Sequence, residues 1–515
     1  MMKVRITLTA GFLLLAAAGN LFAENAKPSS PAMVETTLRN TLWFGTETAA
    51  GLAFSPLKAH NVLDLNYAGK FGEYSRAQDA VTSNGISVST SGALMLGKFN
   101  LWGEFSFNNL FEKGARFNCI RYEVPENMPY YLADSFQSGW NRQEYDLSLK
   151  GASPVLWDHV SFGLSAEYLT RVGAKQKDPR CETYNYQIKA VPSLAIGLGG
   201  GHVLGINGFF RYGHERSTPS INNSMLDQKV FITTGLGEYI LGKVGGNDGQ
   251  KTWFYRDYEY GGGIQYSYEA DVKLLLNADF HMDREDATTA PKLLKRMGTS
   301  KEMNISGDFT ALFGNCLSDR LKAAAEYSTT KGIEYVQSLN TEAFNQRWEV
   351  ISENEMSNFR FMEVSLSYDH LFGATGDGDY DWKVLGELSY MSRNYSYNLP
   401  LSTFDASSLY AGAGGCWNGK FGKADLLVSV KAGYSKALSG EYLYGGTKGD
   451  SELQNLYLHD IAFYGTDNLR TNAGLTCTVH ARKTHFRIGI QGSYILPFGL
   501  KTNRILCSST FGIIF

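Results

Sequence analysis

The feature that most constrains this chain is an alternation of apolar side chains at every second residue, repeated from about residue 61 to the end. In the closing segment, Ile505, Cys507, Phe511, Ile513 and Phe515 alternate with polar or small residues. Successive residues of a strand point to opposite faces, so this period predicts strands with one apolar and one polar face. Alternating segments of about ten residues are typical of membrane-spanning β-strands. The sequence after the N-terminus lacks the roughly 20 consecutive apolar residues of a membrane-spanning helix.

The alternation predicts an all-β fold, a transmembrane antiparallel β-barrel of about 18 strands. The expected strands are 61–75, 84–97, 98–109, 141–152, 158–172, 183–198, 202–213, 253–268, 271–284, 302–314, 320–330, 357–371, 381–397, 407–418, 422–438, 467–481, 485–496 and 503–515. Short links such as Gly199-Gly200-Gly201 alternate with long polar links at 111–140, 214–252, 331–356 and 439–466. This asymmetry is typical of short periplasmic turns and long extracellular loops.

The N-terminus predicts an exported protein. Lys3 and Arg5 precede an apolar run, and residues 1–23 have the layout of a secretory signal peptide, with Glu24 opening the mature chain. Residues 24–58 then precede the barrel domain, 59–515. Trp43 and neighbouring Phe residues in this segment favour a folded structure. Two arrangements remain open, a plug inside the lumen and a periplasmic tail.

Composition supports a membrane location. The chain has 48 Lys+Arg against 51 Asp+Glu, so it lacks the basic excess of a nucleic-acid-binding protein. Its 19% charged residues, 55 Gly, 30 Tyr and 30 Phe depart from the usage of a soluble enzyme. We therefore expect the protein in the outer membrane of a Gram-negative cell, in contact with lipid and lipopolysaccharide and with no nucleic-acid partner.

Two motifs resemble an uncharacterised family of outer-membrane β-barrels from the Bacteroidota. The first is Leu42-Trp43 followed by Thr48-Ala49-Ala50-Gly51-Leu52, and the second is Gly173-Ala174-Lys175-Gln176-Lys177-Asp178-Pro179-Arg180. The resemblance implies a barrel over nearly the whole mature chain. It implies no functional residue, because that family has no assigned reaction or ligand. The terminal strand ending in Phe515 also resembles the signal through which such barrels engage the barrel-assembly machinery.

One pair of residues is a candidate for catalysis. His281 and Asp283 share the inward face of one expected strand, near its extracellular end, where Arg284, Glu285 and Asp286 follow. Outer-membrane proteases resemble this in using His and Asp residues at the rim to activate water. Partner carboxylates from the opposite wall cannot be identified in the sequence, so we expect no catalytic residues and no enzyme activity.

Metal and disulfide chemistry have weak sequence support. His202, His214, His281 and Cys119 lack the spacing of metal ligands, so neither a metal site nor a cofactor is expected. Cys119 and Cys181 fall in neighbouring extracellular loops, and whether they are bridged stays open. Cys477 and Cys507 fall on outward positions, where cysteine acts as a small apolar residue.

The inward face of the expected strands is the main sequence evidence for the function. It interleaves both signs of charge, from Glu104, Glu144 and Asp146 to Arg487 and Arg504, which predicts no single-sign pathway. Such a lining suits either a wide aqueous pore or a lumen closed by ion pairs. The leading function is a channel or gated transporter for a small solute. The alternatives are a non-conducting accessory barrel that binds a receptor or surface lipoprotein and, more remotely, an outer-membrane hydrolase.

Overall fold

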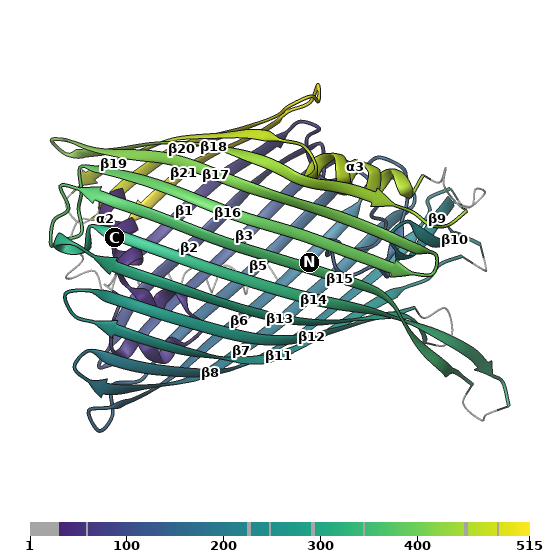
Figure 1. Cartoon of the computed structure of the whole chain (residues 1–515), viewed down its shortest axis with the longest axis horizontal. Helices are drawn as coiled ribbons and strands as arrows, with labels where there is room; N and C mark the ends of the chain where they lie inside the picture. The colour runs from purple at the N-terminus through teal and green to yellow at the C-terminus, as the bar shows by residue number, and fades with distance from the viewer. Residues whose placement is uncertain are drawn as a thin grey trace.

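Eighteen strands form one antiparallel sheet in the computed structural model (Figure 1). The structure describes residues 30–57, 60–223, 228–246, 249–289, 294–342, 346–447, 452–481 and 484–514. The strands are β1 (His60–Phe71), β2 (Thr82–Leu96), β3 (Phe99–Ala115), β5 (Ser138–Ala152), β6 (Val160–Lys175), β7 (Arg180–Gly199), β8 (His202–Ser220), β11 (Trp253–Glu269), β12 (Lys273–Thr289), β13 (Lys295–Phe313), β14 (Asp319–Asn340), β15 (Arg347–Phe372), β16 (Trp382–Asn398), β17 (Leu401–Phe421), β18 (Ala424–Leu443), β19 (Asn468–Ala481), β20 (Thr484–Pro497) and β21 (Arg504–Ile514). Each expected strand is present, which confirms the predicted fold class. The expected signal peptide and Phe515 lie outside the described residues.

The sheet closes on itself. β1 pairs antiparallel with β21, from Val62 opposite Ile514 to Phe71 opposite Ile505. Closure leaves no sheet edge whose backbone groups would lack hydrogen-bond partners in hydrocarbon.

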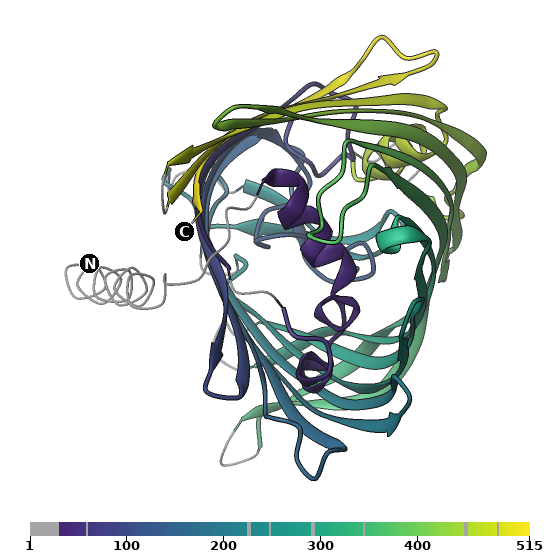
Figure 2. The same cartoon turned by 90° about the vertical axis from the view of Figure 1, so that its left-hand side faces the viewer.

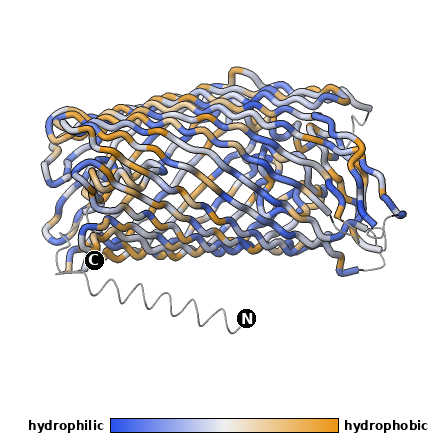
Figure 3. The backbone as a smooth tube through the Cα atoms, turned by 90° about the horizontal axis from the view of Figure 1, so that it is seen from below, coloured by the Kyte–Doolittle hydropathy of each residue, from blue (hydrophilic) through white to orange (hydrophobic). Residues whose placement is uncertain are grey.

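The side chains alternate as the sequence predicts, and Figure 3 shows the alternation along the strands. On β12, Leu276, Phe280 and Met282 are exposed on the outer surface, whereas Leu275 and Asp279 are buried on the inner one. A closed barrel with an apolar exterior is suited to a bilayer, and the protein is an outer-membrane β-barrel. The described helices include none long and apolar enough to cross a membrane.

The long links are more structured than the sequence predicts. The expected loop at 331–356 is mostly an extension of β14 and β15 into a hairpin that projects beyond the barrel (Figure 1). The other long links contain β4 (Leu132–Ala133), the hairpin of β9 (Gln228–Gly235) and β10 (Glu238–Val244), and helix α3 (Gln454–Tyr464). β4, β9 and β10 form a second, three-stranded sheet.

The N-terminal segment, residues 30–57, lies inside the barrel at the end with the short turns (Figure 2). It comprises α2 (Pro31–Asn40) and the 3-10 helices η2 (Leu42–Gly45) and η3 (Ala49–Ala53). The Ser30 side chain caps α2 by accepting a hydrogen bond from the Met33 backbone N–H, and Pro31 follows as the first helical residue. The segment therefore enters the lumen as a defined helix.

Candidate functional site

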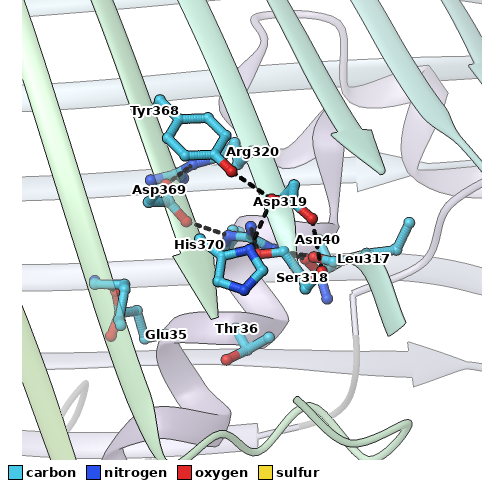
Figure 4. Close-up of polar contacts among 12 residues, drawn as sticks. Glu35, Thr36, Asn40, Leu317, Ser318, Asp319, Arg320, Tyr368, Asp369 and His370 are labelled. Atoms are coloured by element: carbon cyan, nitrogen blue, oxygen red, sulfur yellow. Dashed lines mark hydrogen bonds and ion pairs between the residues drawn. The ribbon is translucent and has the colours of Figure 1, made fainter. Parts of the chain in front are cut away.

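An ion-paired arginine anchors the N-terminal segment to the barrel wall. The Arg39 Nε lies 3.0 Å from Asp369 Oδ1, and both side chains are buried. Its other nitrogens donate to the carbonyl oxygens of Leu317 at 2.7 Å and Ser318 at 3.1 Å. Arg320 donates to the second oxygen of Asp369 at 2.6 Å (Figure 4). The buried charges are thus fully paired, as burial requires.

Further polar contacts join the segment to other parts of the wall. Glu35 pairs with Lys383 on β16. Glu47 pairs with Lys189 on β7 at 2.8 Å, and Lys150 donates to the carbonyl oxygens of Phe44 and Thr46, each at 2.8 Å. Ion pairs and hydrogen bonds therefore hold most of the segment in place.

The apolar part of this attachment is centred on Trp43. The Trp43 side chain is fully buried, and its indole N–H donates to Ser267 Oγ at 3.0 Å. A Cβ at Gly205 would lie 2.8 Å from the Trp43 ring, so this wall position admits only glycine without rearrangement. Trp43 belongs to an apolar cluster of six buried residues among those described.

A second element narrows the lumen from the opposite end. The loop of residues 116–137, between β3 and β5, folds inward and reaches the far wall through Glu126. The Glu126 carboxylate accepts from Arg393 at 2.9 Å, Tyr395 at 3.1 Å and Tyr464 at 2.5 Å. Burial alone would raise the pKa of Glu126, but Arg393 and the hydrogen bond from Tyr464 lower it to about 2. Glu126 therefore stays ionised at any physiological pH.

A polar chamber lies between the N-terminal segment and this loop. Its main cavity has a volume of about 430 Å³. A second cavity of about 300 Å³ extends toward the loop and shares Gln187, Arg211, Asp283 and Glu302 with the first. These volumes suit a small solute.

The chamber is acidic, although the inward face as a whole interleaves both signs of charge as expected. Of the described residues that line the two cavities, eight are carboxylates and three carry a permanent positive charge. The carboxylates are Glu47, Glu167, Glu215, Asp257, Glu259, Asp283, Glu285 and Glu302, and the cations are Arg121, Lys189 and Arg211. Arg211 lies 3.0 Å from Asp257 and 2.8 Å from Glu259. The lumen as a whole carries both signs, but its chamber carries an excess of negative charge.

His281 and Asp283 both line the chamber, on one face of β12 as expected. Their expected place near the strand end is wrong, because β12 continues to Thr289 and contains the charged residues that were expected to begin a loop. His281 Nδ1 lies 3.1 Å from Glu259 Oε1, and its ring packs edge-on against Phe209. The partner carboxylates that the sequence did not identify come from neighbouring strands rather than from the opposite wall.

The other candidate residues lie apart from this arrangement. In the described ranges, no three His, Cys, Asp or Glu side chains form a group able to hold a metal ion. His202 contacts the Tyr266 hydroxyl at 2.8 Å, and His214 lines the smaller cavity. Cys119 and Cys181 are free thiols, both buried in the apolar cluster that includes part of the inward loop.

Sequence reasoning missed the residues that close the lumen. Arg39, Arg121 and Glu126 lie outside the alternating strands from which the sequence predicts inward side chains. Glu35 and Arg39 do carry a usable signal, because they are four residues apart in a helix and share one face. No comparable signal marks Glu126, whose partners are distant in sequence.

A family model matches residues 49–515, and its description is a family of unknown function, DUF6850. The chain belongs to this family. No curated protein matches the DUF6850 chain.

The DUF6850 barrel is similar to several solved structures at low identity. BauA, the ferric preacinetobactin receptor from Acinetobacter baumannii, has 9% identity and a TM-score of 0.41, over 88% of this chain and 80% of BauA. The Pseudomonas putida toluene transporter TodX has 10% identity and a TM-score of 0.29, over 92% of each chain. A Pseudomonas aeruginosa FadL homologue has 11% identity and a TM-score of 0.34, over 91% of this chain and 92% of the homologue. At these values the similarities carry no functional information.

Proposed function

We propose that this protein is a gated channel or transporter for a small polar solute across the outer membrane. The observation that carries the proposal is the chamber of about 430 Å³ inside a closed barrel, bounded by the N-terminal segment. Eighteen strands enclose a lumen wide enough for an aqueous path, and the polar lining of the chamber suits a polar solute. The sequence resemblance supports a member of the Bacteroidota as the source.

The N-terminal segment acts as the plug in this proposal. Its connection to the barrel is a single stretch of chain before β1, and ion pairs and hydrogen bonds at Arg39, Glu47 and Lys150 hold most of it. Polar contacts of this kind are exchangeable for water. Undocking also exposes apolar side chains of the segment, but these are divided among three small clusters. Its departure would open the chamber to the periplasm.

Conductance in planar bilayers tests this function. The mature chain is compared with a chain lacking residues 24–57, after both show the heat-dependent electrophoretic shift of a closed barrel. We expect rare, small openings for the mature chain and conductance at least several-fold higher for the truncated one. Two equally silent proteins would contradict a channel.

A second candidate is an accessory barrel that binds a surface lipoprotein or receptor. It is favoured by the projecting hairpin of β14 and β15, whose Val336 and Ile351 are 51% and 67% exposed. Silent bilayers, together with capture of a partner that is lost on shortening the hairpin, would support this function instead.

We propose no enzymatic role for the chamber. His281 and Asp283 are engaged with Glu259 and Arg211, so their arrangement serves charge pairing. We expect His281→Ala to show no loss of peptidase or lipase turnover relative to the mature chain.

Assembly into the membrane is proposed to proceed through the terminal strand that ends in Phe515, recognised by the barrel-assembly machinery.

A further inference from the structure

Carboxylates stand directly opposite one another in the chamber wall. Across β11, β12 and β13, Glu259 is opposite Asp283 and Asp283 is opposite Glu302. Two residues further along the same inward face, Asp257 is opposite Glu285. Like charges in directly opposed positions destabilise a sheet. These rows therefore do not stabilise the folded barrel. They are suited to binding a ligand of opposite charge.

The cations nearby do not balance these rows. Arg211 on β8 is opposite Glu259 on β11 and also contacts Asp257. Arg121 of the inward loop lies 2.7 Å from Glu285 and 3.4 Å from Glu215. The smaller cavity is lined by five carboxylates and these two arginines, all among the described residues. An excess of negative charge therefore faces the cavity.

Two nearly inaccessible side chains that line the same cavity have open hydrogen-bonding atoms. The Tyr255 hydroxyl belongs to a residue that is 1% exposed, and Asn185 is 9% exposed. In the described part of the chain, neither the Tyr255 hydroxyl nor Asn185 Oδ1 has a hydrogen-bond partner. Buried polar atoms are nearly always paired. These two atoms are therefore positioned for a molecule that enters the cavity.

The open atoms define the chemistry of that molecule. Asn185 Oδ1 is an acceptor, as are Asp257 Oδ1 and Asp283 Oδ1, which also lack partners among the residues described. The open donors are the Tyr255 hydroxyl and nitrogens of Arg121 and Arg211, two guanidinium groups that already lie against carboxylates of the chamber. The open acceptors, together with the excess of carboxylates over arginines, suit a ligand that carries its positive charge on N–H groups. A metal ion fits less well, because no described group of three His, Cys, Asp or Glu residues has the arrangement to hold one.

We infer that the chamber binds an organic cation with several N–H donors, of the primary amine or guanidinium class. The carboxylate rows supply the opposite charge, and Tyr255 and Asn185 supply the remaining hydrogen bonds. The inference rests on the proposed function only for the route by which the solute reaches the chamber.

Isothermal titration calorimetry on the full mature chain in detergent tests the site. The probes are agmatine and glucosamine, with glucose as the uncharged counterpart of glucosamine and MgCl₂ as the metal alone. We expect agmatine and glucosamine to bind and glucose to give no heat. Failure of both cations, binding of glucose as tight as that of glucosamine, or tighter binding of Mg²⁺ than of agmatine would overturn the assignment.

Variants connect binding to the named residues. We expect Asp283→Asn to weaken agmatine binding at least tenfold. Tyr255→Phe keeps the ring beneath Arg121 and is expected to weaken agmatine binding about threefold. The matched control is Glu387→Gln, a luminal carboxylate on β16 that pairs with Lys431 outside the chamber lining and is expected to leave agmatine binding unchanged. Unchanged affinity in both chamber variants would overturn the site. All variants are first checked for the heat-dependent shift of a closed barrel.

Flux into vesicles separates this inference from the proposed function. Agmatine that binds but never crosses the vesicle membrane would contradict the channel and support the site. Equal flux of agmatine and glucose, unaffected by Asp283→Asn, would support the channel and overturn the site.

Discussion

The two elements that close the lumen are built differently. The N-terminal segment is continuous with the barrel at one end only, and its apolar contacts are divided among three clusters with six, three and three buried members among the described residues. The inward loop of residues 116–137 is continuous with strands at both ends, and it contributes to an apolar cluster with twenty-two buried members among the described residues. A large apolar cluster is a poor candidate for movement, because its opening exposes apolar surface at about 25 cal/mol per Å². The comparison indicates a fixed constriction at the loop end and a movable element at the other.

The largest expected effect is a loss of barrel stability when the loop end is damaged. Tyr130 is 1% exposed, and its ring lies where a Cβ at Gly298 would be. Truncation of a buried aromatic residue costs about 3–5 kcal/mol. We expect Tyr130→Ala to lower the free energy of unfolding by that amount, measured by denaturant titration in detergent.

Trp43→Ala is the matched control at the other end. It removes an equally buried aromatic side chain, but the barrel closes through β1 and β21 without it. We expect the unfolding midpoint of the barrel to stay close to wild type, while the N-terminal segment becomes sensitive to protease. Equal losses of barrel stability in the two variants would remove the distinction between the closures.

Arg39→Ala is expected to release the segment without harming the barrel. Loss of one partner from a buried pair costs about 3–5 kcal/mol, and Arg320 still neutralises Asp369, so we expect about 3 kcal/mol. That energy shifts the ratio of docked to undocked segment by roughly 100-fold. The open probability in planar bilayers measures this ratio. The exposed Arg347→Ala, which loses only a surface pair with Glu349, should leave gating unchanged.

Glu47→Gln is expected to act in the same direction with a smaller effect. Its partner Lys189 and Glu47 itself are partly exposed, and solvent-accessible pairs contribute about 0.2–1 kcal/mol. We expect the open probability to rise a few-fold, between wild type and Arg39→Ala. An effect as large as that of Arg39→Ala would indicate that the segment docks through Glu47 instead.

The smallest expected effect is confined to α3 at the loop end. Burial raises the pKa of Asp460 from 3.8 to about 7, although the Ala77 backbone N–H donates to its carboxylate at 2.7 Å. The folded protein thus holds a proton that the unfolded chain releases, so stability falls as the pH rises from about 4 to about 7. Asp460→Asn keeps the acceptor oxygen and removes the titration. Its thermal midpoint should exceed that of wild type at pH 8 and match it at pH 4; equal differences at both pH values would contradict the shift.

The sequence predicts the barrel well because strand alternation is a local pattern. β12 illustrates this, since the inward placement of Asp279, His281 and Asp283 follows from period two alone. The contacts that hold the N-terminal segment and the inward loop in the lumen are not local in the sequence. Glu126 meets Arg393 across 267 residues, and Arg39 meets Asp369 across 330. Such pairs depend on how the loop and segment fold inside the closed barrel, and no residue spacing encodes that.

The acidity of the chamber depends on register for the same reason. Asp257, Glu259 and Asp283 are separately visible as inward charges, but only the strand pairing places Glu259 opposite Asp283. A shift of two residues between β11 and β12 would keep the same faces and give Glu259 another partner, either Glu285 or His281. Sequence alternation fixes the face of a side chain and leaves its neighbours undetermined.

Reversible tethering of the N-terminal segment shows whether its movement controls flux through the barrel. A Cβ at Gly378 would lie 3.7 Å from the Thr36 Cβ, which is a favourable separation for a disulfide. The double variant Thr36→Cys/Gly378→Cys is made in a Cys316→Ser background, because Cys316 is exposed and lines a cavity that Thr36 and Gly378 also line. We expect agmatine flux into vesicles to stop under oxidising conditions and to return after reduction, while the Cys316→Ser parent conducts in both. Equal flux in the oxidised and reduced double variant would contradict a movable N-terminal segment.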